Sequence, residues 1–250
     1  MLNHLKRLIV QTAYDAGEGH IPSAFSVLDI IWVLYNRILR PGPLYSKRDR
    51  FILSKGHGCL ALYTVLVEGG TLPAAGLKHF TAYDGLLGGH PDWGIPGVEA
   101  ASGSLGHGLA IGVGMAMGLQ MLGINRRIFV LMGDEECHEG SVWEAALLAA
   151  ALQLTSVTVI VDDNQSSARS VGVGDLAAKF GAFDWQAIHV DGHDHETLVR
   201  ALAHSHPRRP TAVIAHTVKG NGCKRMEGNP AWHHRVPTET ELAEILEELA

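Results

Sequence analysis

Two short, continuous apolar runs separated by a helical segment constrain the fold of this chain more than any other feature. The runs cover residues 127–132 (R-I-F-V-L-M) and 157–161 (V-T-V-I-V), and the segment between them, 141–153, has a helical pattern. Uninterrupted apolar strands are typical of parallel sheets that are covered by helices on both faces. A strand, helix and strand in this spacing form a right-handed crossover in nearly all known cases. The sequence therefore predicts an α/β fold with a mainly parallel sheet.

Further strands and helices alternate along the rest of the 250 residues. Additional strands are expected at 50–54, 186–190 and 211–215. Helices are expected at 26–39, 58–67, 109–122 and 195–203, and a last one begins at Thr238. Thr238 and Glu241 have the spacing of a capping box, and Ser26 is the expected cap of its helix. These elements predict one doubly wound α/β domain over residues 1–250, with helices on both faces of the sheet.

Charge and cysteine content exclude several function classes. The chain has 20 basic and 26 acidic residues and a formal net charge of −6, whereas a surface that binds nucleic acid is basic. No apolar run approaches the roughly 20 residues of a membrane span, and the N-terminus lacks the pattern of a signal peptide. The 3 cysteines are an odd number without a CxxC motif, which suits a reducing compartment. We therefore expect a cytoplasmic protein that binds neither nucleic acid nor membrane.

Polar side chains follow both of the central apolar runs. Asp134 lies just after the first run and Asn164 just after the second. The intervening helix brings the carboxyl ends of both strands to one edge of the sheet, where ligands bind in open α/β sheets. Carboxylate and amide oxygens suit Mg²⁺, which takes its remaining ligands from phosphate and water. Asp and Asn are also common turn formers, so the spacing alone leaves both a metal site and a structural turn open.

Several motifs occur in the order in which they stand in thiamine diphosphate enzymes. Gly133-Asp134, followed thirty residues later by Asn164, resembles the cofactor motif of that group. The other stretches resemble transketolases in particular: Gly19-His20-Ile21, 49–58 (D-R-F-I-L-S-K-G-H-G), Gly89-His90-Pro91, 102–108 (S-G-S-L-G-H-G) and 226–233 (M-E-G-N-P-A-W-H). The matches run from about residue 17 to residue 237. The chain thus resembles the transketolase family over nearly its whole length.

The resemblance implies thiamine diphosphate and Mg²⁺ as cofactors, together with the residues that hold them. Asp134, Asn164 and the backbone carbonyl of Ser166 would bind the metal ion. Backbone groups and two histidines would line the cofactor: Gly103, Leu105, Glu135, His57 and His233. Mg²⁺ and oriented backbone N–H groups would supply the positive field that a diphosphate needs in an acidic chain.

The implied activity is the transfer of a two-carbon ketol unit from a ketose or ketose phosphate to an aldehyde acceptor. His20, His57 and His90 would face the sugar substrate and share proton transfer, because histidines near neutral pKa can pass protons to a carbonyl or hydroxyl. Glu139 and Glu144 would lie at the interface between two copies of the chain, where they link paired active sites.

Two stretches depart from the family pattern. Glu135 stands where the motif has a glycine, and a non-glycine residue with positive φ there would be strained by roughly 1 kcal/mol or more. We expect the Glu135 side chain to point away from the diphosphate, toward the subunit interface or solvent. The segment 165–169 (Q-S-S-A-R) also differs, and Arg169 is a candidate to face an anionic substrate.

Transketolases are far longer than this chain. Their second domain carries a glutamate that activates the cofactor by protonating its aminopyrimidine ring. We expect this pyrimidine-side domain and the C-terminal domain on a separate chain, which makes the present chain the N-terminal subunit of a split transketolase. Self-association is expected through 109–122 and 139–151, where the small residues Ala145, Ala146, Ala149 and Ala150 would let helices approach closely. The expected assembly contains two of each chain.

Two other functions stay open. One is the α-type subunit of a 2-oxo acid or acetoin dehydrogenase, although the SKGH and SLGHG stretches speak against it. The other is a non-catalytic subunit that stabilises its partner, which Glu135 in place of glycine favours.

Overall fold

A parallel sheet forms the centre of the computed structural model, which describes residues 2–42 and 48–250 apart from the side chain of Arg169. The sheet has 5 strands in the order β1-β2-β3-β5-β4, and every neighbouring pair is parallel. The strands are β1 (Arg50–Leu53), β2 (Ile128–Gly133), β3 (Val157–Asp163), β4 (Gln186–Asp191) and β5 (Thr211–His216). Each predicted strand is confirmed to within two residues, and so is the predicted fold class.

Helices precede, separate and follow these strands. They are α1 (Asn3–Ala16), α2 (Ile21–Val33), α3 (Cys59–Glu68), α4 (His107–Met121), α5 (Gly140–Ala151), α6 (Leu176–Ala182), α7 (His195–Ala203) and α8 (Glu239–Glu248). The capping box predicted at the start of α8 is present, because Thr238 Oγ1 accepts from Glu241 N and Glu241 Oε2 accepts from Thr238 N. The sequence analysis did not predict α1 or α6.

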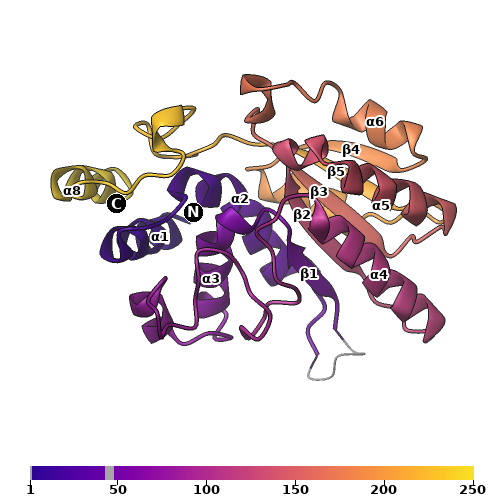
Figure 1. The fold of residues 1–250 in the computed structure, drawn as a ribbon, viewed down its shortest axis with the longest axis horizontal. Helices are drawn as coiled ribbons and strands as arrows, with labels where there is room; N and C mark the ends of the chain where they lie inside the picture. Colours follow the sequence, from indigo (N-terminus) through magenta and orange to yellow (C-terminus); the bar gives the residue numbers. More distant parts are fainter. Residues whose placement is uncertain (1, 43–47) are drawn as a thin grey trace.

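Alternate residues along each strand face two separate cores. In β2, Phe129 and Leu131 belong to one core, whereas Ile128, Val130 and Met132 belong to the other. The first core contains residues of α1, α2, α3, α7 and α8, and the second contains residues of α4, α5 and α6. Figure 1 shows α4 and α5 side by side along one face of the sheet, with α1 to α3 on the other side. Both faces are therefore covered, which is why the central strand β2 is apolar and buried along its length.

Helix α2 begins earlier than the apolar stripe alone predicts. It starts at Ile21 with Pro22 in its first turn, a position where proline loses no helical hydrogen bond. Ser26 is therefore not a cap. It is fully buried inside the helix, and its Oγ donates to Asp162 Oδ2 at 2.9 Å. The helical stretch Ile21–Ile38 is long and apolar enough to span a membrane by length and composition, and 72% of it is buried inside the molecule.

The small residues of α5 face the chain's own core. Ala145, Ala146 and Ala149 are buried against the second core described above, so the expectation that they contact a second copy of the chain is wrong. The exposed apolar residues of α4, α5 and the residues just after them are larger: Ile111, Met121, Leu122, Leu147, Leu148 and Leu152. The apolar surface that remains for a partner is therefore made of these side chains.

Glycine at one position of α4 allows the helix to approach the sheet closely. A Cβ added at Gly112 would lie 2.6 Å from Val130 Cγ2 on β2, which is closer than real Cβ contacts. Further along the same helix, a Cβ added at Gly114 meets nothing within 4 Å. The two glycines thus separate the effect of packing from that of helix propensity.

We predict opposite effects of alanine at these two positions. Gly112→Ala should lower the free energy of unfolding by roughly 1–3 kcal/mol, because the added methyl group overpacks the contact with β2. Gly114→Ala should raise it by about 0.5–1 kcal/mol, because alanine is the better helix former. Urea unfolding of the dilute chain measures both values. Equal effects of the two variants would contradict the close approach.

Candidate active site

The two predicted strand-end oxygens lie at one cavity. Asp134 follows β2 and Asn164 follows β3, and the two strands pair with Gly133 opposite Asp162. Asp134, Asn164 and Ser166 all line this cavity, as the predicted metal set requires. The complete lining is Lys55, His57, Leu105, Gly133, Asp134, Glu135, Glu136, Asn164, Ser166 and Lys219. We refer to it as the strand-end cavity.

Hydrogen bonds fix the orientation of Asp134 and Asn164, the two predicted metal ligands. Asp134 is 1% exposed, and its Oδ2 accepts from the backbone N–H of Ser167 at 2.9 Å. The Asn164 amide nitrogen donates to Asp162 Oδ2 at 2.9 Å, and Asn164 Oδ1 accepts from Ser166 N at 3.1 Å. Ligands that are held in this way lose little side-chain entropy when a metal ion binds.

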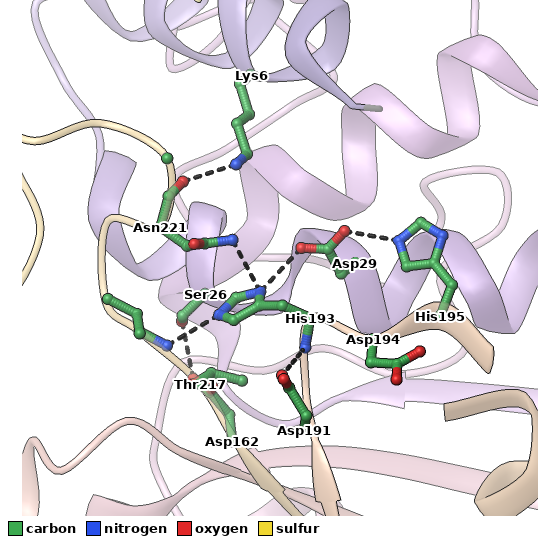
Figure 2. A network of polar contacts seen from close by, with 12 residues as sticks. Lys6, Ser26, Asp29, Asp162, Asp191, His193, Asp194, His195, Thr217 and Asn221 are labelled. Atoms are coloured by element: carbon green, nitrogen blue, oxygen red, sulfur yellow. Dashed lines mark hydrogen bonds and ion pairs between the residues drawn. The ribbon is translucent and has the colours of Figure 1, made fainter. Parts of the chain in front are cut away.

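A buried ion pair lies directly beneath the cavity. Lys55, just after β1, pairs with Asp162 at the end of β3, and their side chains are 3% and 0% exposed. Asp162 also accepts from Ser26 Oγ of α2 and from Thr217 Oγ1 just after β5. Figure 2 shows Ser26 and Thr217 close to Asp162. A buried carboxylate needs such a set of donors, because leaving it unpaired would be strongly destabilising.

A second buried acid, Glu136, connects three loops of the site. Its Oε2 accepts from Ser54 Oγ at 2.5 Å and from Gly106 N at 2.8 Å, and its Oε1 accepts from Gly133 N at 3.1 Å. Burial raises the pKa of Glu136 above its usual range, against the lowering effect of these hydrogen bonds. The loops after β1 and β2 and the glycine-rich loop before α4 are therefore held together by one side chain.

The predicted histidines gather at one side of the cavity. The ring centroids of His20 and His57 are 5.3 Å apart, and those of His20 and His233 are 5.4 Å apart. His90 lies beside the Gly103 loop, because a Cβ added at Gly103 would be 3.4 Å from its ring. The glycine- and proline-rich segment between Phe80 and α4 thus carries two of the predicted site residues, His90 and Gly103.

Burial lowers the pKa of His20, His57 and His233. It lowers the pKa of His20 to about 4, and neighbouring histidines act in the same direction. Burial and the charge of Lys55 lower the pKa of His57 far below its usual range. Burial and the charge of Lys219 lower the pKa of His233. Neutral imidazoles can accept a hydrogen bond or a proton from a sugar hydroxyl.

Unpaired polar atoms indicate that the cavity is built for a polar ligand. His57 Nε2 and Ser102 Oγ are buried and have no hydrogen-bond partner among the described residues. Gly103 has a φ of +148° and lies beside the His90 ring, where its backbone can approach a ligand closely. The residues fit thiamine diphosphate with Mg²⁺, since they offer metal-binding oxygens, lysines and unpaired donors together.

Lys219 was missed by the sequence analysis. Its Nζ lies 3.1 Å from Ser166 Oγ and 2.9 Å from His233 Nδ1, so it brings a positive charge to the strand-end cavity. The available signal was its place in Thr217-Val218-Lys219-Gly220, which directly follows β5 at the same edge of the sheet as the ends of β2 and β3.

The backbone strain expected at Glu135 is not found there, and a positive φ occurs at Gln165 instead. Glu135 lies in the 3-10 turn Asp134–His138 and is not among the described residues with positive φ, so the expected strain is absent there. Gln165, next to Asn164, has a φ of +62° instead. Glu135 lines the cavity, and its charge raises the pKa of His233 against burial and Lys219. Whether it points away from a bound diphosphate stays a prediction, and the side chain of Arg169 lies outside the described residues.

Glu139 and Glu144 lie away from the cavity lining. Both are exposed on the chain, at the start of α5 and one turn into it. This position leaves them available to a second copy, so their predicted role at an interface stays a prediction.

An all-parallel sheet whose strand ends bring together Asp134, Asn164 and a glycine-rich loop defines the diphosphate-binding half of a thiamine diphosphate enzyme. Comparison with known proteins gives the particular family. Residues 1–249 match the family model described as "Transketolase, thiamine diphosphate binding domain". The chain belongs to this family, so the predicted family, transferase class and cofactors are confirmed.

Similar proteins cover the chain almost completely. It is 34% identical to one subunit of the apulose-4-phosphate transketolase of Phocaeicola vulgatus, over 98% of this chain and 91% of the relative. It is 37% identical to the corresponding subunit from Actinobacillus succinogenes, over 98% of this chain and 92% of the relative. The solved transketolase from Leishmania mexicana is 27% identical with a TM-score of 0.90, and the chain covers 40% of its length. The family match favours the transketolase branch over a 2-oxo acid dehydrogenase subunit.

We predict that the metal oxygens control cofactor binding. Asp134→Ala should abolish Mg²⁺-dependent binding of thiamine diphosphate, because one of few protein ligands of the ion is lost. Asn164→Ala should weaken binding strongly, and titration calorimetry measures both effects. Asp163→Ala is the matched control. Asp163 directly precedes Asn164 in the sequence, but it does not line the cavity and pairs with His216 instead. Unchanged affinity in the Asp134 variant would show that the site is wrongly assigned.

We also predict a pH dependence of stability that comes from His20. Its pKa is about 4 in the folded chain and about 6.5 when unfolded, so between these values the unfolded state binds more protons. The free energy of unfolding should therefore fall as the pH is lowered from 6.5 to 4, and less steeply in His20→Gln. Urea unfolding at several pH values compares the two proteins. Parallel curves would mean that His20 is not held neutral by burial.

Proposed function

We propose that this chain is the diphosphate-binding subunit of a two-chain transketolase. It would transfer a two-carbon ketol unit from a ketose phosphate to an aldehyde acceptor. The observation that carries the proposal is the strand-end cavity, where Asp134, Asn164 and Ser166 lie beside the unpaired His57 Nε2. When bound, thiamine diphosphate supplies the nucleophilic carbon for this chemistry.

The histidines of this chain would handle the sugar. His20, His57 and His90 would bind the hydroxyl and carbonyl oxygens of the substrate and move protons there, and each such group contributes roughly 10²–10⁴ to a rate. His20 is suited to this role because burial keeps its pKa near 4, so its ring nitrogen has a lone pair at neutral pH. Lys219 and His233 would bind the cofactor rather than the sugar, since Lys219 Nζ lies against Ser166 and against the His233 ring.

A separate partner chain would complete the active site. Two relatives that match this chain almost end to end are named as subunits, whereas this chain covers only 40% of the length of the transketolase chain from Leishmania mexicana. The partner would carry the pyrimidine-side domain and the glutamate that activates the cofactor. The absence of a positive φ at Glu135 removes the strain that favoured a non-catalytic subunit.

Self-association would use the exposed apolar residues of α4 and α5. Leu147, Leu148 and Leu152 are 59%, 45% and 40% exposed on the chain alone, and Glu139 and Glu144 stand on the same segment. An exposed apolar patch bordered by acids is typical of a protein interface. The proposed assembly holds two copies of each chain and two active sites. The location proposed for it is the cytoplasm, where the free thiols of Cys59, Cys137 and Cys223 would stay reduced.

We predict that the isolated chain is folded and self-associated but turns over no ketose, because the partner's glutamate is absent. Mixing with the partner subunit should restore ketol transfer. A panel of phosphorylated and unphosphorylated ketoses, with apulose 4-phosphate included because of the names of the relatives, identifies the donor. Mass measurement in solution and a ketol-transfer assay make the test.

Two variants serve as controls for this assembly. Leu148→Glu should shift the isolated chain to smaller species, whereas Tyr83→Glu, at a fully exposed side chain outside α4 and α5, should not. A stable monomer of the unmodified chain would contradict the proposed assembly. Sustained turnover without any partner would contradict the two-chain enzyme.

A further inference from the structure

A network of histidines and acids lies on the far side of the loop that carries Lys219. Figure 2 shows Asp29 of α2 between His193 and His195. Asp29 Oδ2 lies 2.9 Å from His193 Nδ1, and Asp29 Oδ1 lies 2.7 Å from His195 Nε2. His195 also stacks on Trp32, with a centroid distance of 5.3 Å. None of these residues lines the strand-end cavity, so the network needs another explanation.

The hydrogen bonds determine the tautomer of His193. Its Nε2 accepts from the backbone N–H of Val218 at 2.9 Å, so in the neutral ring Nδ1 carries the proton. Asp29 Oδ2 and the amide nitrogen of Asn221 both lie 2.9 Å from Nδ1, and of these two only the carboxylate oxygen can accept that proton. Burial would raise the pKa of Asp29, but the two histidines hold it below its usual range. Asp29 therefore accepts the Nδ1 proton. This bond fixes the imidazole in the orientation in which its Nε2 accepts the backbone N–H of Val218.

The loop that follows β5 depends on such polar contacts. Val218 is 44% exposed, so its side chain contributes little burial to hold the loop in place. On the other side of Lys219, Asn221 is held by Lys6 Nζ, which donates to its carbonyl oxygen at 2.7 Å. Gly220 N donates to Pro22 O at 3.0 Å. Lys219 thus projects from a short segment that is anchored before and after it.

We propose that His193, oriented by Asp29, is a positioning residue for the cofactor site. It fixes the backbone at Val218 so that Lys219 reaches Ser166 and His233, and this step rests on the proposed function. The link is short, because Lys219 directly follows the anchored residue and its Nζ lies 3.1 Å from Ser166 Oγ. The role of His193 is therefore to set the place of a positive charge at the diphosphate.

Two substitutions of His193 separate the hydrogen bond to the Val218 amide, which we call the anchor, from the mere presence of an imidazole ring. The amide of asparagine ends where Nδ1 stands, so His193→Asn can reach Asp29 but offers no acceptor to Val218. Glutamine is one bond longer, and its Oε1 can accept in the place of Nε2. His193→Gln is therefore the matched control, because it also removes the ring.

The first measurement is amide hydrogen exchange of the full chain in its complex without cofactor. The Val218 amide should exchange slowly in the unmodified protein and in His193→Gln, and about 10-fold faster in His193→Asn, the effect of losing one hydrogen bond. Equal exchange in all three proteins would overturn the anchor. This measurement does not depend on cofactor binding.

The second measurement is the affinity of the complex for thiamine diphosphate with Mg²⁺. His193→Asn should lower it about 10-fold, which is the weight of one hydrogen bond, and His193→Gln should stay near the unmodified value. In a Lys219→Met background, His193→Asn should change the affinity less than about 2-fold, because residues that act through one another are not additive.

The possible failures are distinguishable. An equal loss with and without Lys219 would show that His193 supports the fold and does not position the lysine, which overturns the inference. Full cofactor affinity in His193→Asn would overturn it as well, while the proposed function stands. Absence of cofactor binding by the unmodified complex would overturn the proposed function and the positioning role together.

Discussion

The buried pair of Lys55 and Asp162 is the contact on which the site depends. Asp162 is fully buried and receives Lys55 Nζ, Ser26 Oγ, Thr217 Oγ1 and the Asn164 amide. These donors come from the ends of β1, β3 and β5 and from inside α2. Removing the carboxylate would leave a buried ammonium without its partner, which is far more destabilising than a lost surface ion pair. The pair therefore joins the sheet edge to one helix layer.

This contact also explains the orientation of the predicted metal ligand. The amide nitrogen of Asn164 donates a hydrogen bond to Asp162 Oδ2. The amide oxygen of Asn164 therefore points the other way, toward Ser166 N, and both residues line the strand-end cavity. Asp134 is oriented by a backbone N–H in the same manner. Glu136 adds a third fixed point, because it joins the loop before α4 to the ends of β1 and β2. Preorganisation of this kind is what a hard cation with strict geometry requires.

The sequence predicted the sheet well and the contacts between distant segments poorly. Buried parallel strands leave apolar runs that can be read directly, as at β2 and β3. Strand ends then locate Asp134 and Asn164. In contrast, α1 was missed although its buried residues Leu5, Ile9 and Ala13 have helical spacing. Helix α2 begins at Ile21, so Ser26 lies inside the helix, where it donates to Asp162 and is not a cap. The contact of Lys219 with Ser166 and that of Asp29 with His193 join residues far apart in the chain, so no local pattern could indicate these contacts. Only the place of Lys219 after β5 was a signal that the sequence offered.

The balance of charge at the cavity gives the metal ion a necessary role. Asp134 and Glu135 line it, and the whole chain carries a formal net charge of −6. The charge of Lys55 is paired with Asp162, and the histidines are held neutral by burial. A diphosphate brings further negative charge, which Lys219 alone would offset only in part. Bound Mg²⁺ would change this balance, because the carboxylate of Asp134, as its predicted ligand, would no longer repel the diphosphate. The metal ion and the diphosphate should therefore bind as one unit, and on the proposal above the position of Lys219 would set how well the protein holds that unit.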